Sequence, residues 1–145
     1  MKKFLIIAIV GTMLFGVAAC TKKDDNTTST PAATPTKTDL LIAKKWKLTA
    51  LTVDGADFYA IMDACDQDDL RIFKAGGVYN ADNGPTKCDP ADDQIFIIST
   101  WALSDNDTKL TFDGDTFTIN ELTATSMKLT ITEGGNTGVL TLAGQ

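Results

Sequence analysis

Apolar and polar side chains alternate with a period of two along several stretches of this chain. In residues 45–50 the apolar side chains take the even positions, and the alternation recurs in residues 116–119 and 127–132. Because successive side chains of a strand point to opposite faces, such segments turn one face to a core and the other to water. The pattern therefore predicts half-buried β-strands. Its parity changes between Ala50 and Leu51, which predicts a bulge or a strong bend there.

Short polar and glycine-rich segments separate these strands. Asp113-Gly114 is the strongest hairpin signal, because Asp-Gly suits the positive φ angles of a type I′ turn. Three further turns are expected at residues 75–77, 104–107 and 134–136. We expect about eight strands in sequential antiparallel order, with helix limited to residues 38–43 and 57–62.

Sequential hairpins leave two open sheet edges unless the sheet closes on itself. Closure of eight strands removes both edges and encloses a small interior. We therefore predict an all-β fold, an eight-stranded antiparallel up-and-down barrel. A two-sheet β-sandwich is the alternative. The long predicted strand at residues 94–103 favours the barrel, since it is long enough to bend around a corner.

The N-terminus has the organisation of a lipoprotein signal peptide. Lys2 and Lys3 precede an apolar run at residues 4–15, and the small residues 17–19 precede Cys20. The apolar run is too short to span a bilayer. We predict that residues 1–19 are removed and that Cys20 carries acyl chains such as palmitate. Two or more such chains hold a protein stably on a membrane.

Residues 20–38 are predicted to form a lipidated flexible tether, and residues 39–145 to form the folded domain. Residues 21–38 contain no Leu, Ile, Val, Met or aromatic residue, so they cannot bury enough apolar surface to offset their ordering entropy. Within them, Lys23 followed by two aspartates resembles the lipoprotein export signal of Bacteroidota, which directs lipoproteins to the outer face of the outer membrane. The alternative is a solvated charged linker.

Charge and composition exclude several classes of function. The chain has a net charge of −6 and no histidine. Residues 39–145 hold eight Lys and Arg against seventeen Asp and Glu, a net −9. This balance argues against a nucleic-acid partner. Without histidine, a G-x-S-x-G motif or a phosphate-binding motif, we expect no enzyme, no cofactor and no catalytic residue.

Two cysteines remain in the predicted domain, Cys65 and Cys88. An exported domain folds in an oxidising environment, so we predict that they form a disulfide; free thiols are the alternative. Two cysteines without histidine do not suffice for zinc, and no metal site is predicted. The acids beside the two cysteines could attract Ca²⁺, but a solvated acidic surface is the favoured interpretation. These acids are Asp63, Asp66, Asp68, Asp69, Asp89, Asp92 and Asp93.

A set of segments in fixed order resembles the lipocalin-like domain of Bacteroidota lipoproteins, from about Asp39 to Leu142. The resemblance implies an eight-stranded up-and-down barrel, no catalytic residues and no agreed ligand. Lipocalins usually carry Gly two residues before the Trp of the first strand, whereas this chain has Lys44 there. The segments that carry the resemblance are residues 40–41, 45–49, 63–66, 68–69, 73–79, 86–90, 100–103 and 119–123.

These features predict a non-catalytic lipoprotein anchored in the outer membrane, on its cell-surface or periplasmic face. Its domain would bind a small apolar ligand or a protein partner through residues that the sequence does not identify. Trp46 and Trp101 could line a ligand pocket, but a core position is the favoured interpretation. The alternative function is an adhesin-like or structural β-sandwich that binds glycan or protein, which exposed Tyr59 and Tyr79 would favour.

Overall fold

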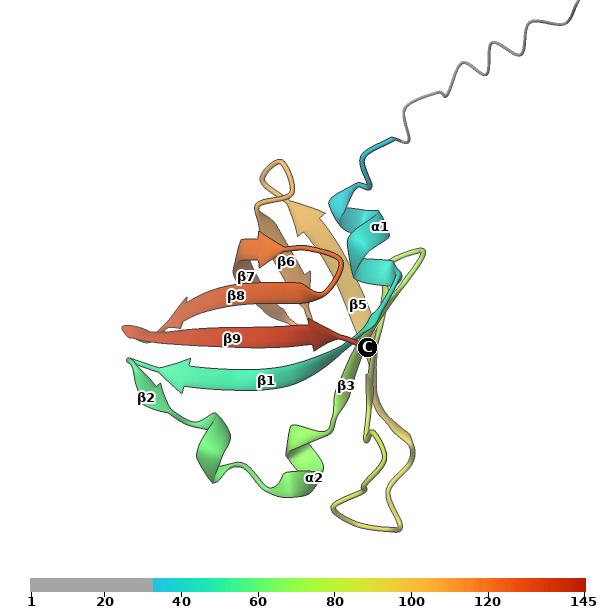
Figure 1. Cartoon of the computed structure of the whole chain (residues 1–145), viewed down its shortest axis with the longest axis vertical. Helices are drawn as coiled ribbons and strands as arrows, with labels where there is room; N and C mark the ends of the chain where they lie inside the picture. The colour runs from blue at the N-terminus through green and yellow to red at the C-terminus, as the bar shows by residue number, and fades with distance from the viewer. Residues whose placement is uncertain (1–32) are drawn as a thin grey trace, which may run out of the picture. The chain divides into compact units, whose positions relative to one another are not determined.

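The computed structural model describes residues 33–145, which contain nine strands and three short helical segments. The helical segments are α1 (Lys37–Ile42), a 3-10 turn (Tyr59–Ile61) and α2 (Ala64–Gln67). The strands are β1 (Lys45–Val53), β2 (Ala56–Asp57), β3 (Leu70–Lys74), β4 (Val78–Asp82), β5 (Ile95–Ser104), β6 (Lys109–Phe112), β7 (Asp115–Leu122), β8 (Ser126–Glu133) and β9 (Asn136–Gly144). Figure 1 shows their arrangement.

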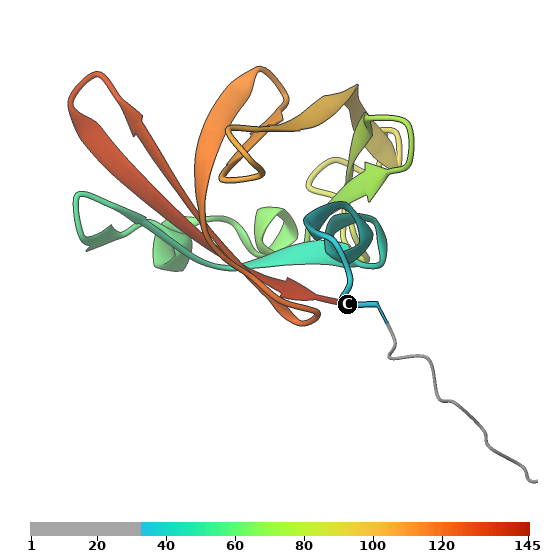
Figure 2. The same cartoon turned by 90° about the horizontal axis from the view of Figure 1, so that it is seen from above.

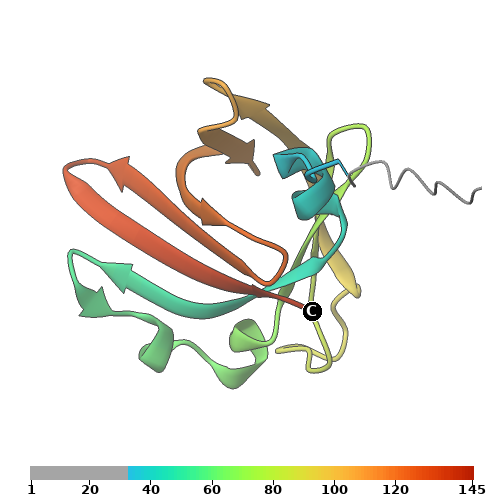
Figure 3. The same ribbon diagram turned by 45° about the horizontal axis from the view of Figure 1, so that its top comes forward.

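The sheet closes into a barrel. From β3 to β9 each strand pairs antiparallel with the next, β3 pairs with β1, and β1 also pairs with β9. These eight strands curve around a common centre (Figures 2 and 3), while the two-residue β2 adds to β1 from outside the ring. The predicted eight-stranded antiparallel barrel is confirmed, and the closed β1–β9 pairing excludes the sandwich.

The predicted turns connect the strands as short hairpins. Asp113 and Gly114 form a two-residue loop between β6 and β7, and both have positive φ angles, 52° and 89°. The loops at residues 75–77, 105–108 and 134–135 join β3 to β4, β5 to β6 and β8 to β9. Tight loops keep consecutive strands adjacent, which is what allows a meander to close.

The core is built from the inward rows of the alternating strands. Trp46, Leu48 and Leu129 are almost fully buried, and Ile131 packs against the buried cluster. The Nε1 groups of both tryptophans donate hydrogen bonds to backbone carbonyls, Trp46 to Leu41 at 3.0 Å and Trp101 to Lys74 at 2.8 Å. Both tryptophans are thus core residues, as the favoured interpretation held.

The irregularity in β1 lies earlier than predicted. Its pairing with β9 shifts register between Leu48 and Ala50, so the extra residue is Thr49, not the Ala50–Leu51 junction. Thr49 is exposed, and its hydroxyl donates to the carbonyl of Thr141 at 3.1 Å. This hydrogen bond holds the bulged residue outward while the apolar row re-enters the core at Leu51.

The two helices pack at opposite ends of the barrel (Figure 1). α1 leads into the start of β1, and Leu41 is completely buried. It begins at Lys37, because Thr36 and Asp39 form a capping box; residues 37 and 38, assigned to the tether from composition, are therefore helical. α2 leads into the start of the antiparallel neighbour β3 and was not predicted. We call these ends the α1 end and the α2 end.

Lys44 stands where lipocalins usually carry Gly. In this chain a glycine on the last strand, Gly144, provides close packing beside Lys44 instead. Gly144 of β9 pairs with Trp46, and a Cβ atom there would lie 3.2 Å from Cγ of Lys44.

In the part of the chain that the structure describes, no helix has the length and apolar character needed to cross a membrane.

Candidate ligand-binding cavity

A cavity of about 330 Å³ opens at the α2 end of the barrel. Its walls come from the start of β3, the end of β4, the start of β5 and the hairpin between β6 and β7, with α2 beside the opening. In this topology these segments all lie at the end opposite α1. The residues that line it are Met62, Asp66, Asp69, Leu70, Arg71, Tyr79, Ala81, Phe96, Ile97, Phe112, Asp113, Asp115, Phe117 and Leu140.

Aromatic side chains separate the cavity from the packed half of the barrel. The rings of Phe112 and Phe117 stack with centroids 4.6 Å apart, and Tyr79 lies 5.0 Å from Phe112. Behind them Phe73 meets Phe112 and Trp101 edge to face. Such ring contacts stabilise the cluster beyond its buried area. The α1 half of the barrel is therefore filled, whereas the smaller Ala81 helps to leave space at the α2 end.

One basic side chain, Arg71, is turned into the barrel. It pairs across the sheet with Trp46 on one side and Ala81 on the other, and both of these are buried. Residues directly opposite each other on neighbouring strands share a face, so Arg71 lies on the inner face and lines the cavity. A guanidinium here offers several hydrogen-bond donors to whatever occupies the cavity.

Four carboxylates surround the same space: Asp66, Asp69, Asp113 and Asp115. Burial raises the pKa of Asp69 from 3.8 to about 6, and the neighbouring charge of Asp66 acts in the same direction on this pKa. Arg71 acts in the opposite direction without restoring the ordinary pKa. The cavity thus holds a carboxylate whose negative charge Arg71 compensates only in part.

Besides Arg71 and the four aspartates, the cavity walls carry the hydroxyl of Tyr79 as a polar group. Tyr79 is only 3% exposed, and burial raises its pKa to about 12, so it stays protonated at neutral pH. Within residues 33–145 this hydroxyl has no hydrogen-bond partner. Tyr79 lines the cavity, so a ligand atom or water there can form a hydrogen bond with this hydroxyl.

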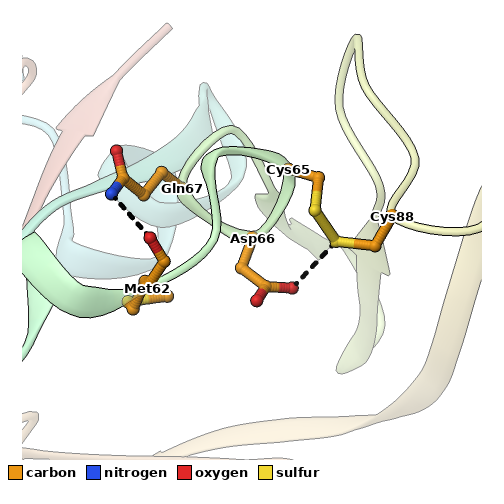
Figure 4. Close-up of a disulfide and its surroundings, with 5 residues drawn as sticks. All are labelled: Met62, Cys65, Asp66, Gln67 and Cys88. Atoms are coloured by element: carbon orange, nitrogen blue, oxygen red, sulfur yellow. Dashed lines mark hydrogen bonds between the residues drawn. A yellow bond between two sulfur atoms is a disulfide. The ribbon is translucent and has the colours of Figure 1, made fainter.

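A disulfide fixes the opening. Cys65 in α2 is bonded to Cys88 in the loop between β4 and β5, with Cα atoms 5.2 Å apart (Figure 4). Next to it, Oδ1 of Asp66 lies 3.3 Å from Sγ of Cys88. Gln67 donates through Nε2 to the carbonyl of Met62 at 3.1 Å. These contacts set the position of α2, and hence of Asp66, at the side of the cavity.

The acids grouped from the sequence divide between two places. Asp66 and Asp69 line the cavity, and Asp63, Asp89, Asp92 and Asp93 are exposed in the surrounding loops, while Asp68 is half-buried beside the cavity residues without lining it. Among residues 33–145 three potential metal ligands converge at Cys65, Asp66 and Cys88. Both sulfur atoms there belong to the disulfide, so they are not available as thiolate ligands.

Other sequence predictions have different outcomes. Tyr79 is buried and Tyr59 half-buried, so neither provides the exposed tyrosine that the adhesin-like alternative required. Cys20, the signal segment 1–19 and the tether up to residue 32 lie outside the described residues.

Sequence reasoning missed the inward Arg71. A charged residue in the apolar row between Trp46 and Ala81 could have revealed it, but only once the strand register was known.

The closed eight-stranded sheet, with a helix at one end and a cavity at the other, defines the class of protein as a β-barrel with an internal cavity. The chain belongs to the lipocalin-like domain family, whose model matches residues 42–129. The match includes every residue that lines the cavity except Leu140. Barrels of this kind generally bind small hydrophobic ligands. Comparisons with curated proteins and with solved structures gave no match.

Proposed function

We propose that this protein is a non-catalytic lipoprotein of the outer membrane that holds a small ligand with an apolar body in the α2-end cavity. The single observation that carries the proposal is the cavity itself. A barrel of this size can fill its interior with its own side chains, yet about 330 Å³ remains open beside Phe112 and Phe117. A pocket with apolar walls and a few polar groups is the usual form of a small-molecule site.

Membrane attachment is the second part of the proposal. The charged n-region, the apolar run and the small residues before Cys20 support lipidation. The segment Lys23-Asp24-Asp25 supports export to the outer surface, in the manner of Bacteroidota lipoproteins. The net charge of −9 on residues 39–145 favours a tether that keeps the domain about 8 Å or more from anionic headgroups, where salt screens the repulsion.

The ligand proposal is tested with a chain that begins at Thr21, which keeps all the described residues and lacks the lipid. Native mass spectrometry of this chain, purified from the cells that produce it, should show a bound small molecule that dissociates on activation. Naphthalen-1-ylmethanol, a neutral probe, should also bind and quench protein fluorescence. Absence of both a carried molecule and probe binding would overturn the proposal.

A variant that fills the cavity, compared with the same substitution on the outer face of the barrel, tests whether the probe binds inside. Ala81 is 4% exposed and lines the cavity, so Ala81→Phe places a ring in the space that the ligand needs. We expect it to weaken binding of the neutral probe by about tenfold or more. Ala102→Phe places the same ring on the exposed face of β5 and is the control. Equal affinities of the two variants would show that the probe binds elsewhere.

A further inference from the structure

The charges around the cavity indicate which ligands it selects, an inference that rests on the proposed binding function. Four of the residues that line it are aspartates and one is an arginine. They come from separate parts of the chain: Asp66 lies in α2, Asp69 lies just before β3 and Arg71 within it, and Asp113 lies in the turn between β6 and β7, with Asp115 at the start of β7. The residues that line the cavity therefore carry an excess of negative charge, and they approach the cavity from two sides.

No salt bridge within the described chain pairs these carboxylates with a positive charge. Among residues 33–145 the one ion pair within 4.0 Å joins Lys45 to Asp82, whose atoms are 3.8 Å apart, and neither residue lines the cavity. Arg71 is therefore not in direct ion contact with Asp69 or its neighbours. Asp69 is half-buried, so its carboxylate attracts a cation more strongly than a carboxylate in water does, whereas Asp66, Asp113 and Asp115 are exposed and add a weaker attraction.

The walls suit the rest of such a ligand. Phe112, Phe117 and Tyr79 present aromatic surface, which packs against an apolar body and also attracts a positive charge over its face. The unpaired hydroxyl of Tyr79 can accept a hydrogen bond from an ammonium group. A carboxylate ligand would find one favourable partner in Arg71 but would face four aspartates.

We propose that the cavity selects ligands that join an apolar, preferably aromatic, body to a protonated amine. The ammonium group is held by Asp69, with Asp66, Asp113 and Asp115 adding long-range attraction. The body lies against Phe112 and Phe117. Arg71 repels a cation placed next to it, and so it directs the ammonium group toward the aspartates.

Three probes that share one body test the charge preference. They are naphthalen-1-ylmethanamine, which is cationic, the neutral naphthalen-1-ylmethanol and the anionic naphthalene-1-acetate, titrated into the chain that begins at Thr21 at neutral pH and low salt. We expect the amine to bind about tenfold tighter than the alcohol and the carboxylate to bind weakest.

The outcomes separate this inference from the proposed function. Equal affinity for all three probes would leave the apolar cavity as a binding site and would overturn the amine selectivity. Preference for the carboxylate would overturn it as well and would assign the cavity to anions through Arg71. Failure of all three probes to bind would count against the cavity as a site for bodies of this size, and so against both proposals.

Charge variants locate the effect. Asp69→Asn keeps the shape of the side chain, and we expect it to bring the ratio of amine to alcohol affinity close to one. Asp92→Asn removes one exposed charge outside the cavity and should leave the ratio unchanged. Arg71→Gln should raise the affinity for the amine and lower that for the carboxylate. If Asp92→Asn lowers the ratio as much as Asp69→Asn, the preference reflects only the overall charge, and the inference fails.

Discussion

Gly84 lies where the loop after β4 touches the end of α2. Its φ is +61°, and a Cβ atom there would be 2.2 Å from the carbonyl oxygen of Asp68. A real Cβ cannot approach backbone this closely, so Gly84→Ala must displace Asp68 or the loop. We expect it to lower the free energy of unfolding by about 3 kcal/mol, from left-handed backbone strain and the clash together, as measured by urea denaturation.

Gly134 is the matched control for this prediction. It has nearly the same φ, +59°, but a Cβ atom at this position would have nothing within 4 Å, so Gly134→Ala introduces only the strain of the backbone conformation. We expect a loss of about 1 kcal/mol. Similar losses for the two variants would mean that Gly84 contributes through its φ angle alone and that the contact with Asp68 is readily relaxed.

Asp69 should make stability depend on pH. Its pKa is about 6 in the folded chain and ordinarily 3.8, so between these values the folded state holds a proton that the unfolded state releases. This contribution to stability is therefore lost as pH rises through the window, and the full penalty acts above about pH 6. Asp69→Asn removes the penalty, which solvent screening of the partly exposed carboxylate limits to ~1 kcal/mol.

Urea denaturation of both chains at two pH values tests this expectation. Asp69→Asn should be more stable than the natural chain at neutral pH, and the difference should vanish near pH 3, below both pKa values, where both states of the natural chain are mostly protonated. A gain of the same size at both pH values would assign the effect to packing rather than to the charge.

At the scale of the element, the disulfide is what joins α2 to the barrel wall. α2 has only four residues, too few to be stable as an isolated helix, and Cys65–Cys88 closes a loop across 23 positions of sequence. We expect Cys65→Ser with Cys88→Ser to lower the free energy of unfolding by ~3 kcal/mol, measured by urea denaturation. The natural chain under reducing conditions should lose a similar amount; no loss in either case would contradict this role.

Some elements of the fold could be predicted from the sequence, and others could not. The alternation around Trp46 and the Asp113-Gly114 turn are local signals, and they correctly predicted strands, a hairpin and a barrel. The α2 helix was missed because four residues are too few for a helical period to be visible. The cavity was not predictable either, since Arg71, Tyr79 and Phe117 meet only through the register of strands distant in sequence.

At the scale of the molecule, the two ends of the barrel differ: hydrogen bonds close the α1 end, and the cavity opens at the α2 end. At the α1 end, Lys37 donates through Nζ to the carbonyl of Asp107 at 2.6 Å, and the amide of Gln145 donates to the carbonyl of Lys45 at 2.8 Å. These bonds tie the helix and the C-terminus across that end, beside the completely buried Leu41. The described chain thus begins at the sealed end, and the cavity opens at the other.

This separation leads to a prediction for intact cells. The first residue that lines the cavity is Met62, so a protease that cuts within residues 21–32 removes no part of the binding site. If the lipoprotein is anchored through Cys20 on the outer surface, protease added to intact cells should release a fragment that contains residues 33–145. Mass spectrometry would identify the cut.

The released fragment should bind naphthalen-1-ylmethanamine with the same affinity as the chain that begins at Thr21, because every described contact is retained. Release only after the outer membrane is permeabilised would place the domain on the periplasmic face. A fragment that is released but binds the amine more weakly would show that residues before the cut contribute to the site, which would contradict a binding site confined to the barrel. A Cys20→Ser chain should appear in the soluble fraction, since without acyl chains nothing in residues 33–145 provides a helical membrane anchor.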